Sequence, residues 1–371
     1  MFDIDLIAFS HNEGEEQYVD YLQDKLNISI TLIPITLNPW RKIHERLFDV
    51  IPDNYARWLD EDIKLLVKRR IEASNYQFIH CIDNCMTQYC LNANKSVHVM
   101  TDHSRIDSEY QLEKFKYLQG FKKKILALEI LVKTILYEKR LNRRFPNHIV
   151  CSDEDAQYLT KHNSKHINVL TIVNGFDTES FPILDSINRN KNKVLIFTGA
   201  MDYTPNIDAM HWFCSEIFPR ILSQYPNTIL KIVGIKPVES IQNLQSTNIH
   251  VLGAVDDIST YYQTSDLYIC PLRIGGGSRL KLVEAMAMKC PIVTTNIAAQ
   301  GLILKNNKHV IFADTAHDFA QYCNAALCDQ SLLDNLALGG YHHAHSAYEW
   351  QILLKPILHY YQNQQFKRGL L

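Results

Sequence analysis

The sequence has no strong excess of charge of either sign. Its 38 lysines and arginines nearly balance its 40 aspartates and glutamates, and the formal net charge is −2. Proteins that bind nucleic acid through their overall charge carry a basic excess. The composition therefore gives no indication of a nucleic-acid partner.

Cysteine spacings typical of metal sites are also missing. The nine cysteines are scattered, and no two of them form a Cys-x-x-Cys pair, which argues against a structural zinc site. Cys81, Cys85 and Cys90 cluster beside apolar residues, where buried thiols are the favoured interpretation and a metal site is the alternative. Because unpaired cysteines are typical of reducing compartments, we expect a cytoplasmic protein.

Long apolar runs are absent too. No stretch of the sequence approaches the ~20 apolar residues that are needed to cross a bilayer. The N-terminus also lacks the basic-then-apolar pattern of a signal peptide. We therefore expect neither a membrane-spanning helix nor export by a signal peptide.

What the chain does contain is an alternation of strand and helix patterns over 371 residues, a length that suits two domains. Such alternation predicts parallel sheets covered by helices. Strands are predicted at residues 5–10, 28–35, 78–82, 97–100, 148–152, 169–173, 193–199, 229–234, 250–253, 265–272, 292–295 and 310–313. Helices are predicted at residues 14–26, 40–73 with a break at Pro52, 111–145 and 278–290, followed by two helices within 315–345 and one from 348 onward.

The most informative stretch is residues 273–291. Apolar residues before it predict a buried strand at 265–272, a second strand follows at 292–295, and a helix starts near Ser278 between them. The turn into that helix carries glycines at 275–277. Backbone N–H groups of such a turn, together with the positive end of the helix, favour an anion.

Charged side chains on the same helix agree with an anion site. Arg279 and Lys281 place two cations in the first turn, where they oppose the helix dipole unless a negative ligand is bound. Glu284 lies further along and is placed to accept hydrogen bonds from ribose hydroxyls. Together these residues favour a nucleotide diphosphate; the alternative is a glycine-rich turn with solvated charges.

Residues 275–293, GGGSRLKLVEAMAMKCPIV, resemble the donor-site signature of the GT-B retaining glycosyltransferases of family 4, the glycosyl transferases group 1. The likeness is strongest to the exopolysaccharide sugar transferases of that family. Three other segments are similar to its motifs and follow in the same order, at residues 173–181, 197–209 and 251–258. The four segments together span more than a quarter of the chain from first to last and occur in the expected order.

The resemblance implies an α/β fold of the GT-B type, with two Rossmann-like domains facing each other across a cleft. It implies an N-terminal acceptor-side domain at residues 1–178, a nucleotide-sugar-binding domain at 179–350, and a terminal helix at 351–371 that returns to the first domain. Relatives begin with an earlier strand and a glycine-rich loop. The N-terminal domain is therefore expected to lack its first strand.

The resemblance also implies which residues hold the donor. The glycine-rich turn at 275–277 would bind the phosphates. The loop after the strand at 193–199 would also contact the donor, and the backbone near Val255 would face the base. An Asx turn is the alternative role for the polar residues of that loop. The expected donor-binding residues are Gly275, Gly276, Gly277, Ser278, Arg279, Lys281, Glu284, Asp202, Asn206 and Val255.

On the acceptor side, relatives place a histidine after the strand that matches 97–100, and that histidine reaches the transferred sugar. His103 is therefore the candidate catalytic residue, with Asp102 and Asp107 in support, and an ordinary surface loop is the alternative. His80 stands at another strand end, and we interpret it as a buried core histidine rather than an acceptor-side residue.

The family likeness implies transfer of a hexose with retention of configuration, without a metal and with no cofactor beyond the nucleotide-sugar co-substrate. Cations and N–H dipoles would stabilise the departing diphosphate, whose phosphate would take the acceptor proton. Family 4 enzymes often carry a second glutamate eight positions before Glu284, and this chain has Gly276 there, as the exopolysaccharide branch does.

Residues 111–145 form a basic amphipathic helical pattern. Such helices can lie on anionic membrane surfaces, which would suit a lipid-linked acceptor and a location on the inner face of the membrane. The alternative is a helix packed on its own domain with solvated cations. The basic residues are Lys114, Lys116, Lys122, Lys123, Lys124, Lys133, Lys139, Arg140, Arg143 and Arg144.

The predicted function is a retaining glycosyltransferase that moves a sugar from a nucleotide-diphosphate sugar to a hydroxyl of a glycan or lipid-linked acceptor, in surface polysaccharide or glycolipid biosynthesis. The alternative is a non-catalytic, nucleotide-binding or scaffold subunit that has lost part of the acceptor cleft. A sugar-nucleotide epimerase is a more distant alternative.

Overall fold

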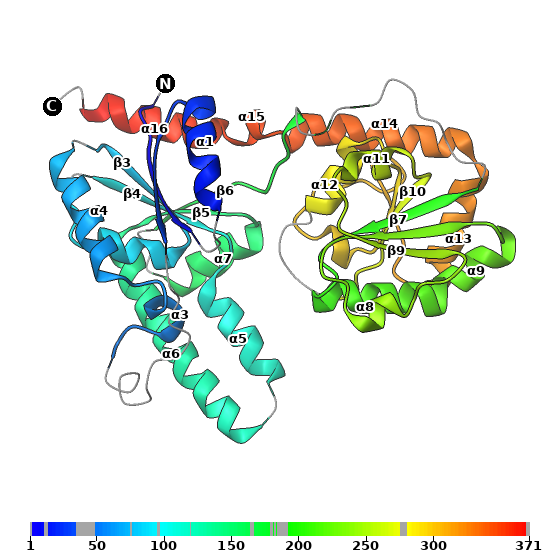
Figure 1. Ribbon diagram of the computed structural model, residues 1–371, viewed down its shortest axis with the longest axis horizontal. Coiled ribbons are helices and arrows are strands. Elements are labelled where there is room, and N and C mark those ends of the chain that lie inside the picture. Colours follow the sequence, from blue (N-terminus) through cyan, green and yellow to red (C-terminus); the bar gives the residue numbers. More distant parts are fainter. Residues whose placement is uncertain are drawn as a thin grey trace. The chain divides into compact units, whose positions relative to one another are not determined.

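The computed structural model describes residues 2–10, 14–34, 49–74, 76–94, 97–118, 120–163, 167–178, 181, 183, 192–274 and 280–368. The chain divides into two compact units (Figure 1). Unit 1 comprises Met1–Ile149 and Gln157–Val169, and unit 2 comprises Val150–Ala156 and Leu170–Leu371. The domain boundaries inferred from the family likeness remain predictions.

The first half of the chain alternates strands and helices, as its pattern predicts. Its elements are β1 (Asp5–Ser10), η1 (Glu15–Tyr18), α1 (Val19–Leu26), β2 (Ser29–Pro34), α3 (Asp53–Ala56), α4 (Glu61–Ala73), β3 (Phe78–Ile82), η2 (Asn84–Cys90), β4 (His98–His103), α5 (Asp107–Tyr117), α6 (Phe121–Arg144), β5 (Asn147–Val150), α7 (Asp153–His162) and β6 (Asn168–Thr171).

These strands form two separate sheets. β1 and β2 pair in parallel, with Asp5 opposite Ser29. The other strands form a four-stranded sheet in the order β3-β4-β5-β6, in which β3 and β4 are parallel. Val99 of β4 and Ile149 of β5 are buried, as expected where helices cover a parallel sheet. The expected lack of an earlier strand remains a prediction.

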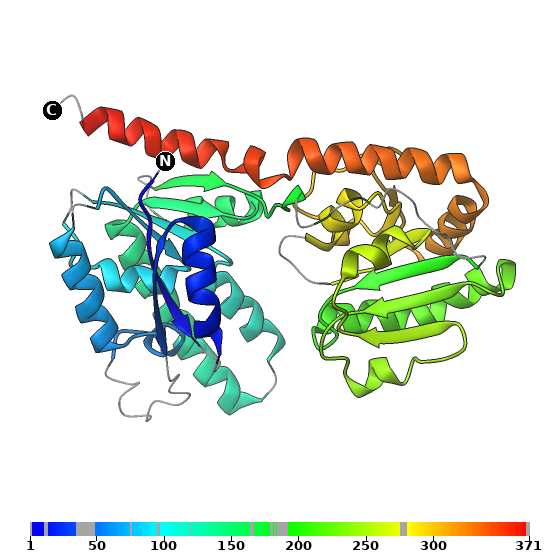
Figure 2. The same cartoon turned by 45° about the horizontal axis from the view of Figure 1, so that its top comes forward.

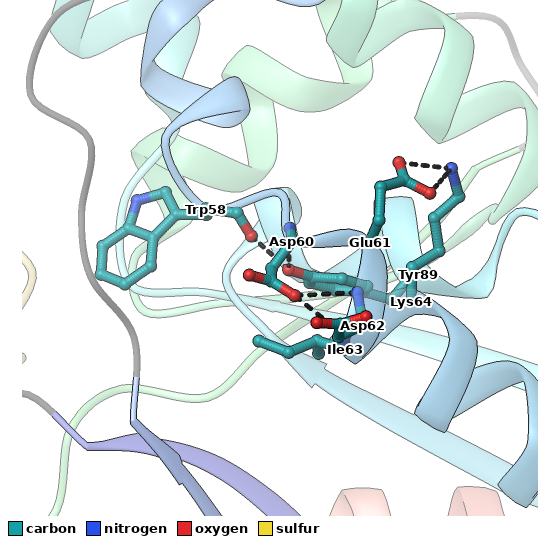
Figure 3. A network of polar contacts seen from close by, with 7 residues as sticks. All are labelled: Trp58, Asp60, Glu61, Asp62, Ile63, Lys64 and Tyr89. Atoms are coloured by element: carbon teal, nitrogen blue, oxygen red, sulfur yellow. Dashed lines mark hydrogen bonds and ion pairs between the residues drawn. The ribbon is translucent and has the colours of Figure 1, made fainter.

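The start of α4 is held by a cap (Figure 3). The Asp60 side chain accepts hydrogen bonds from the backbone N–H groups of Asp62 at 2.9 Å and Ile63 at 3.0 Å, which satisfies two of the unpaired donors at a helix start. The Tyr89 hydroxyl accepts from the Asp60 N–H at 3.1 Å and donates to the carbonyl of Trp58. Tyr89 thus ties η2 to the loop before α4.

The basic stretch predicted as helical at 111–145 is two helices, α5 and α6, which lie side by side in Figures 1 and 2. Gly120 precedes α6 with a φ of 96°. Residues that have a Cβ atom rarely adopt this backbone conformation. Glycine therefore favours a break between the helices at this point. The chain reverses direction there, and the expectation of one continuous basic stretch is corrected to a helical hairpin.

The second half of the chain continues the alternation. Its elements are β7 (Val194–Thr198), α8 (Thr204–Trp212), η4 (Phe213–Ile217), α9 (Phe218–Gln224), β8 (Ile229–Val233), α10 (Glu239–Gln242), β9 (Ile249–Gly253), α11 (Ile258–Gln263), β10 (Leu267–Cys270), α12 (Leu280–Ala287), β11 (Ile292–Thr294), η5 (Ile297–Ala299), β12 (Ile311–Phe312), α13 (Ala316–Cys328), α14 (Gln330–Ala347), α15 (Trp350–Leu353) and α16 (Lys355–Arg368).

Unit 2 contains a six-stranded parallel sheet in the order β12-β11-β10-β7-β8-β9. Every residue of β7 and β10 is buried, because helices cover both faces (Figures 1 and 2). The predicted crossover of strand, helix and strand is confirmed as β10, α12 and β11. The strand order reverses between β7 and β10, and in open α/β sheets ligands bind beyond the carboxyl ends of strands at such a reversal.

Within the described ranges, none of the helices has the length and apolar character that crossing a bilayer requires.

Candidate donor site at the carboxyl ends of β7 and β10

Half of the predicted donor-binding residues lie outside the described residues. These are Gly275, Gly276, Gly277, Ser278 and Arg279. β10 ends at Cys270, the described residues continue to Ile274, and they resume at Leu280, the first residue of α12. The geometry of the site is therefore described from Lys281 and Glu284, which lie on α12.

The backbone is unusually close-packed where β7 ends. Gly199 follows β7 directly, and a Cβ atom on it would lie 2.6 Å from Nδ2 of Asn206 and 2.8 Å from Nζ of Lys281. A Cβ on Gly234, which follows β8, would lie only 1.7 Å from the carbonyl oxygen of Gly199. Both positions therefore favour glycine, and the carboxyl end of β7 lies against that of β8 and beside Lys281 of α12.

Lys281 is held at this strand end by a polar contact. Its Nζ donates to Oδ1 of Asn206 at 2.8 Å and lies 4.6 Å from the centre of the Phe197 ring. Asn206 is 4% exposed, and its Nδ2 donates to the carbonyl of Ala200 at 2.8 Å. The structure thus brings two of the predicted donor-binding residues together. A cation fixed beside a strand end is suited to bind an anion.

Glu284 belongs to the same site and points toward a group of buried hydroxyls. Its Oε2 accepts a hydrogen bond from the Tyr262 hydroxyl at 3.2 Å, and Tyr262 lies 2.8 Å from Oγ1 of Thr198, the last residue of β7. Burial raises the pKa of Glu284 above its ordinary value, while the Tyr262 hydrogen bond and the charge of Lys281 lower it. A partly buried carboxylate beside a cation can accept hydrogen bonds from a polar ligand.

Two other predicted donor-binding residues have contacts of their own. Asp202, in the loop after β7, faces Lys236 with 4.0 Å between Oδ2 and Nζ. Val255 is partly buried against the hydrophobic core of unit 2. Neither contact tests their proposed roles, which remain predictions.

In unit 1, the two predicted catalytic residues have different surroundings. His103, in β4, is 2% exposed, and its Nε2 lies 3.0 Å from Nδ1 of His148 in β5. Burial and, secondarily, the neighbouring imidazole lower the pKa of His103 to about 3, and burial lowers that of His148 to about 4. Both imidazoles are therefore neutral at pH 7.

Asp102 faces the other side of β4, because successive side chains of a strand alternate. Its Oδ2 lies 3.1 Å from Nε2 of His80 in β3, and the two side chains are 38% and 35% exposed. The interpretation of His80 as a core histidine is therefore wrong: its side chain is solvated and paired with a carboxylate. Asp107, the expected second support, starts α5, and burial raises the pKa of its carboxyl.

Tyr262 and Thr198 are site residues that sequence reasoning missed. They stand 22 and 86 positions before Glu284, too far apart for any local pattern to connect them. A tyrosine on a helix and a threonine ending a strand are ordinary core residues by composition. Tyr262 lies on α11 and Thr198 ends β7, and only the tertiary structure brings their hydroxyls together beside Glu284 of α12.

Comparison with known proteins identifies the second half of the chain. Residues 192–329 match the family model described as Glycosyl transferases group 1. The chain is 22% identical over 344 residues to a putative glycosyltransferase, YtcC, of Bacillus subtilis, in a match covering 84% of this chain and 78% of that protein.

Other relatives share the domain at lower coverage. The chain is 24% identical over 209 residues to the phosphatidyl-myo-inositol mannosyltransferase of Mycobacterium tuberculosis, which covers 53% of this chain and 54% of that protein. It thus spans about half the length of that relative. Among solved structures, Anabaena Alr3699/HepE in complex with UDP and glucose is similar with a TM-score of 0.65 at 15% identity, covering 96% of this chain and 99% of that chain.

The family model falls on unit 2, where the site lies, and the neighbouring solved structures include glycosyltransferases of the GT-B fold. The predicted α/β fold with parallel sheets is confirmed. Residues 192–329 are therefore a glycosyl transferases group 1 domain, and the chain shares the GT-B fold of these solved structures.

Proposed function

We propose that this protein is a retaining hexosyltransferase that moves a sugar from a nucleotide-diphosphate sugar to a hydroxyl of a glycan or lipid-linked acceptor. The supporting observation is the position of Lys281 and Glu284 on α12, beside the carboxyl end of β7, where the strand order reverses. A similar solved structure contains UDP and glucose, which agrees with a nucleotide-sugar donor. The product would enter surface polysaccharide or glycolipid biosynthesis.

In this proposal, Lys281 neutralises charge on the leaving diphosphate. Breaking a glycosyl–phosphate bond builds negative charge on the diphosphate and positive charge on the sugar ring. A preorganised cation that meets this charge contributes roughly 3 kcal/mol to the transition state. Arg279 and the glycine turn would add to it, and no metal would be needed.

Glu284 would hold the ribose of the donor, because a carboxylate accepts hydrogen bonds from vicinal hydroxyls. Its distance in sequence from Lys281 is three residues, so both side chains project from one face of α12. His103 and Asp102 remain the proposed acceptor-side residues. The neutral, buried His103 would act there as a hydrogen-bonding group and not as a cation.

Purified protein tests the proposal directly. We expect release of nucleoside diphosphate from one of UDP-glucose, UDP-N-acetylglucosamine or GDP-mannose, at a rate that EDTA does not change. Lys281→Met should slow the release about a hundredfold, whereas Lys355→Met, on the exposed face of α16, should leave it unchanged. Glu284→Ala should weaken donor binding, and unchanged binding would remove Glu284 from the site.

The same experiment distinguishes the alternative function. A non-catalytic nucleotide-binding or scaffold subunit would bind a nucleotide sugar yet neither hydrolyse nor transfer it. Binding without turnover, with an acceptor extract of lipid-linked glycans present, would therefore favour that alternative.

We further propose that the protein acts in the cytoplasm, at the inner face of the membrane, through the α5–α6 hairpin. Five apolar side chains on one face of α6 are strongly exposed: Phe121 at 82%, Ile125 at 54%, Leu128 at 47%, Val132 at 46% and Leu136 at 61%. Lys122, Lys123 and Lys124 beside them are exposed as well. Apolar and basic side chains on one helix suit an anionic lipid surface.

A further inference from the structure

A chain of hydroxyl groups connects the Glu284 carboxylate with two strands of the sheet in unit 2. Tyr262 of α11 donates to Oε2 of Glu284 at 3.2 Å. Oγ1 of Thr198, at the end of β7, lies 2.8 Å from the Tyr262 hydroxyl and 3.1 Å from the Tyr268 hydroxyl of β10. Thr198, Tyr262 and Tyr268 are buried, at 2%, 0% and 0% exposure.

The direction of every proton in this chain follows from the carboxylate. An ionised carboxylate only accepts hydrogen bonds, so the single proton of Tyr262 is committed to Glu284. Thr198 must then donate to the oxygen of Tyr262, and Tyr268 must donate to the oxygen of Thr198. All three hydroxyls point their protons toward Glu284, and such aligned chains strengthen each bond in a buried, low-dielectric setting.

We propose that Tyr262 is a positioning residue: it holds Glu284 in the orientation and the ionised state in which the carboxylate binds the ribose hydroxyls of the nucleotide. This inference rests on the proposed function. Tyr262 contacts only one oxygen of Glu284, Oε2, and the proposal assigns the second oxygen, Oε1, to the ribose. Rigid support for the carboxylate reduces the entropy lost when a ribose binds.

The test uses Tyr262→Phe, which deletes one oxygen and keeps the ring. Tyr261→Phe is the matched control, because it makes the same change one residue away, where the ring faces Lys231 at 5.3 Å. Binding of UDP, GDP and ADP, and of the 2′,3′-dideoxy form of whichever binds most tightly, would be measured by calorimetry. Melting temperatures of the variants establish that each one is folded.

We expect Tyr262→Phe to bind the ribonucleotide about tenfold more weakly and the dideoxynucleotide as tightly as the unmodified protein does. Tyr261→Phe should change neither affinity. In a Glu284→Gln background, Tyr262→Phe should add little further loss, because the two residues act as a unit. Since the Tyr262 hydrogen bond lowers the pKa of Glu284, its loss should move the acid limit of ribonucleotide binding to higher pH.

Equal weakening of both nucleotides by Tyr262→Phe would overturn the inference, since it would mean that Tyr262 supports the fold in general. Unchanged affinity for the ribonucleotide would overturn it as well. In both cases the proposed function would stand. If the unmodified protein bound none of the three nucleotides, the proposed function and the inference would both be wrong.

Discussion

A partly buried glutamate, Glu284, and a buried one, Glu138, have different partners, and the difference sets their chemistry. Glu284 has Lys281 and Tyr262 beside it, both of which favour its charged form. Glu138 of α6 is 5% exposed and accepts from the backbone N–H of Ser108 at 3.1 Å and from the Tyr55 hydroxyl at 3.4 Å. No cation is among the causes that shift the pKa of Glu138, which burial raises to about 7.

This pKa makes stability depend on pH. Because the pKa of Glu138 is higher in the folded state than in the unfolded state, its contribution is most favourable at low pH. It is lost as pH rises from the ordinary glutamate value to about 7. Glu138→Gln should therefore gain stability relative to the unmodified protein between pH 5 and pH 8, by roughly 3 kcal/mol at most.

Urea unfolding of both proteins at the two pH values measures this gain, with Glu113→Gln on the exposed surface of α5 as the charge control. Asp107 and Tyr158 also lie near the glutamate, so both are kept unchanged. A Glu138→Gln difference that is the same at pH 5 and pH 8 would contradict the assigned direction of the pKa.

At the scale of single elements, α6 combines two roles on two faces. Leu131, Tyr137 and Leu141 are buried and anchor the helix in unit 1. The apolar stripe of α6, which consists of Phe121, Ile125, Leu128, Val132 and Leu136, is exposed. A helix whose exposed face is apolar has surface left to bury against another surface. The adjacent lysines favour an anionic one.

Vesicle sedimentation tests the lipid contact. We expect the protein to sediment with vesicles of phosphatidylglycerol and phosphatidylcholine, and less so as salt increases. Replacing Phe121 and Ile125 by serine should lower the partition coefficient at least tenfold, since burying each side chain is worth roughly 2 kcal/mol. Ile303→Ser, at an equally exposed site in unit 2 with 80% exposure, should leave sedimentation unchanged.

If neither salt nor the double substitution changed the fraction of protein that sediments, the apolar stripe of α6 would not be the membrane contact. If the protein did not sediment with anionic vesicles at all, the proposed membrane location would be wrong.

At the scale of the whole molecule, the candidate donor site lies within unit 2, so donor binding should stabilise that unit in particular. A nucleotide sugar at a hundred times its dissociation constant adds about 2.7 kcal/mol to the stability of the state that binds it. Thermal unfolding with UDP-, GDP- and ADP-sugars should show an upward shift with one of them. Lys281→Met should reduce the shift, and a shift of equal size in that variant would place the ligand elsewhere.

The element order of both units could be predicted from the sequence, because hydrophobic periodicity is a local property. The βαβ crossover from β10 to β11 illustrates this: its buried strands and its helix follow each other closely in the sequence. The placement of Lys281 and Glu284 on one helix was predicted in the same way, and their roles remain predictions. Gly120 was visible in the sequence, yet its effect on the basic stretch depended on the backbone conformation it adopts.

The sequence by itself therefore determined the α/β class, the order of the strands along the chain and the helix that carries Lys281 and Glu284. Tertiary structure decided which distant side chains meet there. The tertiary packing brings Tyr262 to Glu284 and links it to Thr198 and Tyr268, and the alternation of β4 turns Asp102 toward His80 and His103 toward His148. These contacts join residues far apart in the chain, where local patterns carry no information about pairing or register.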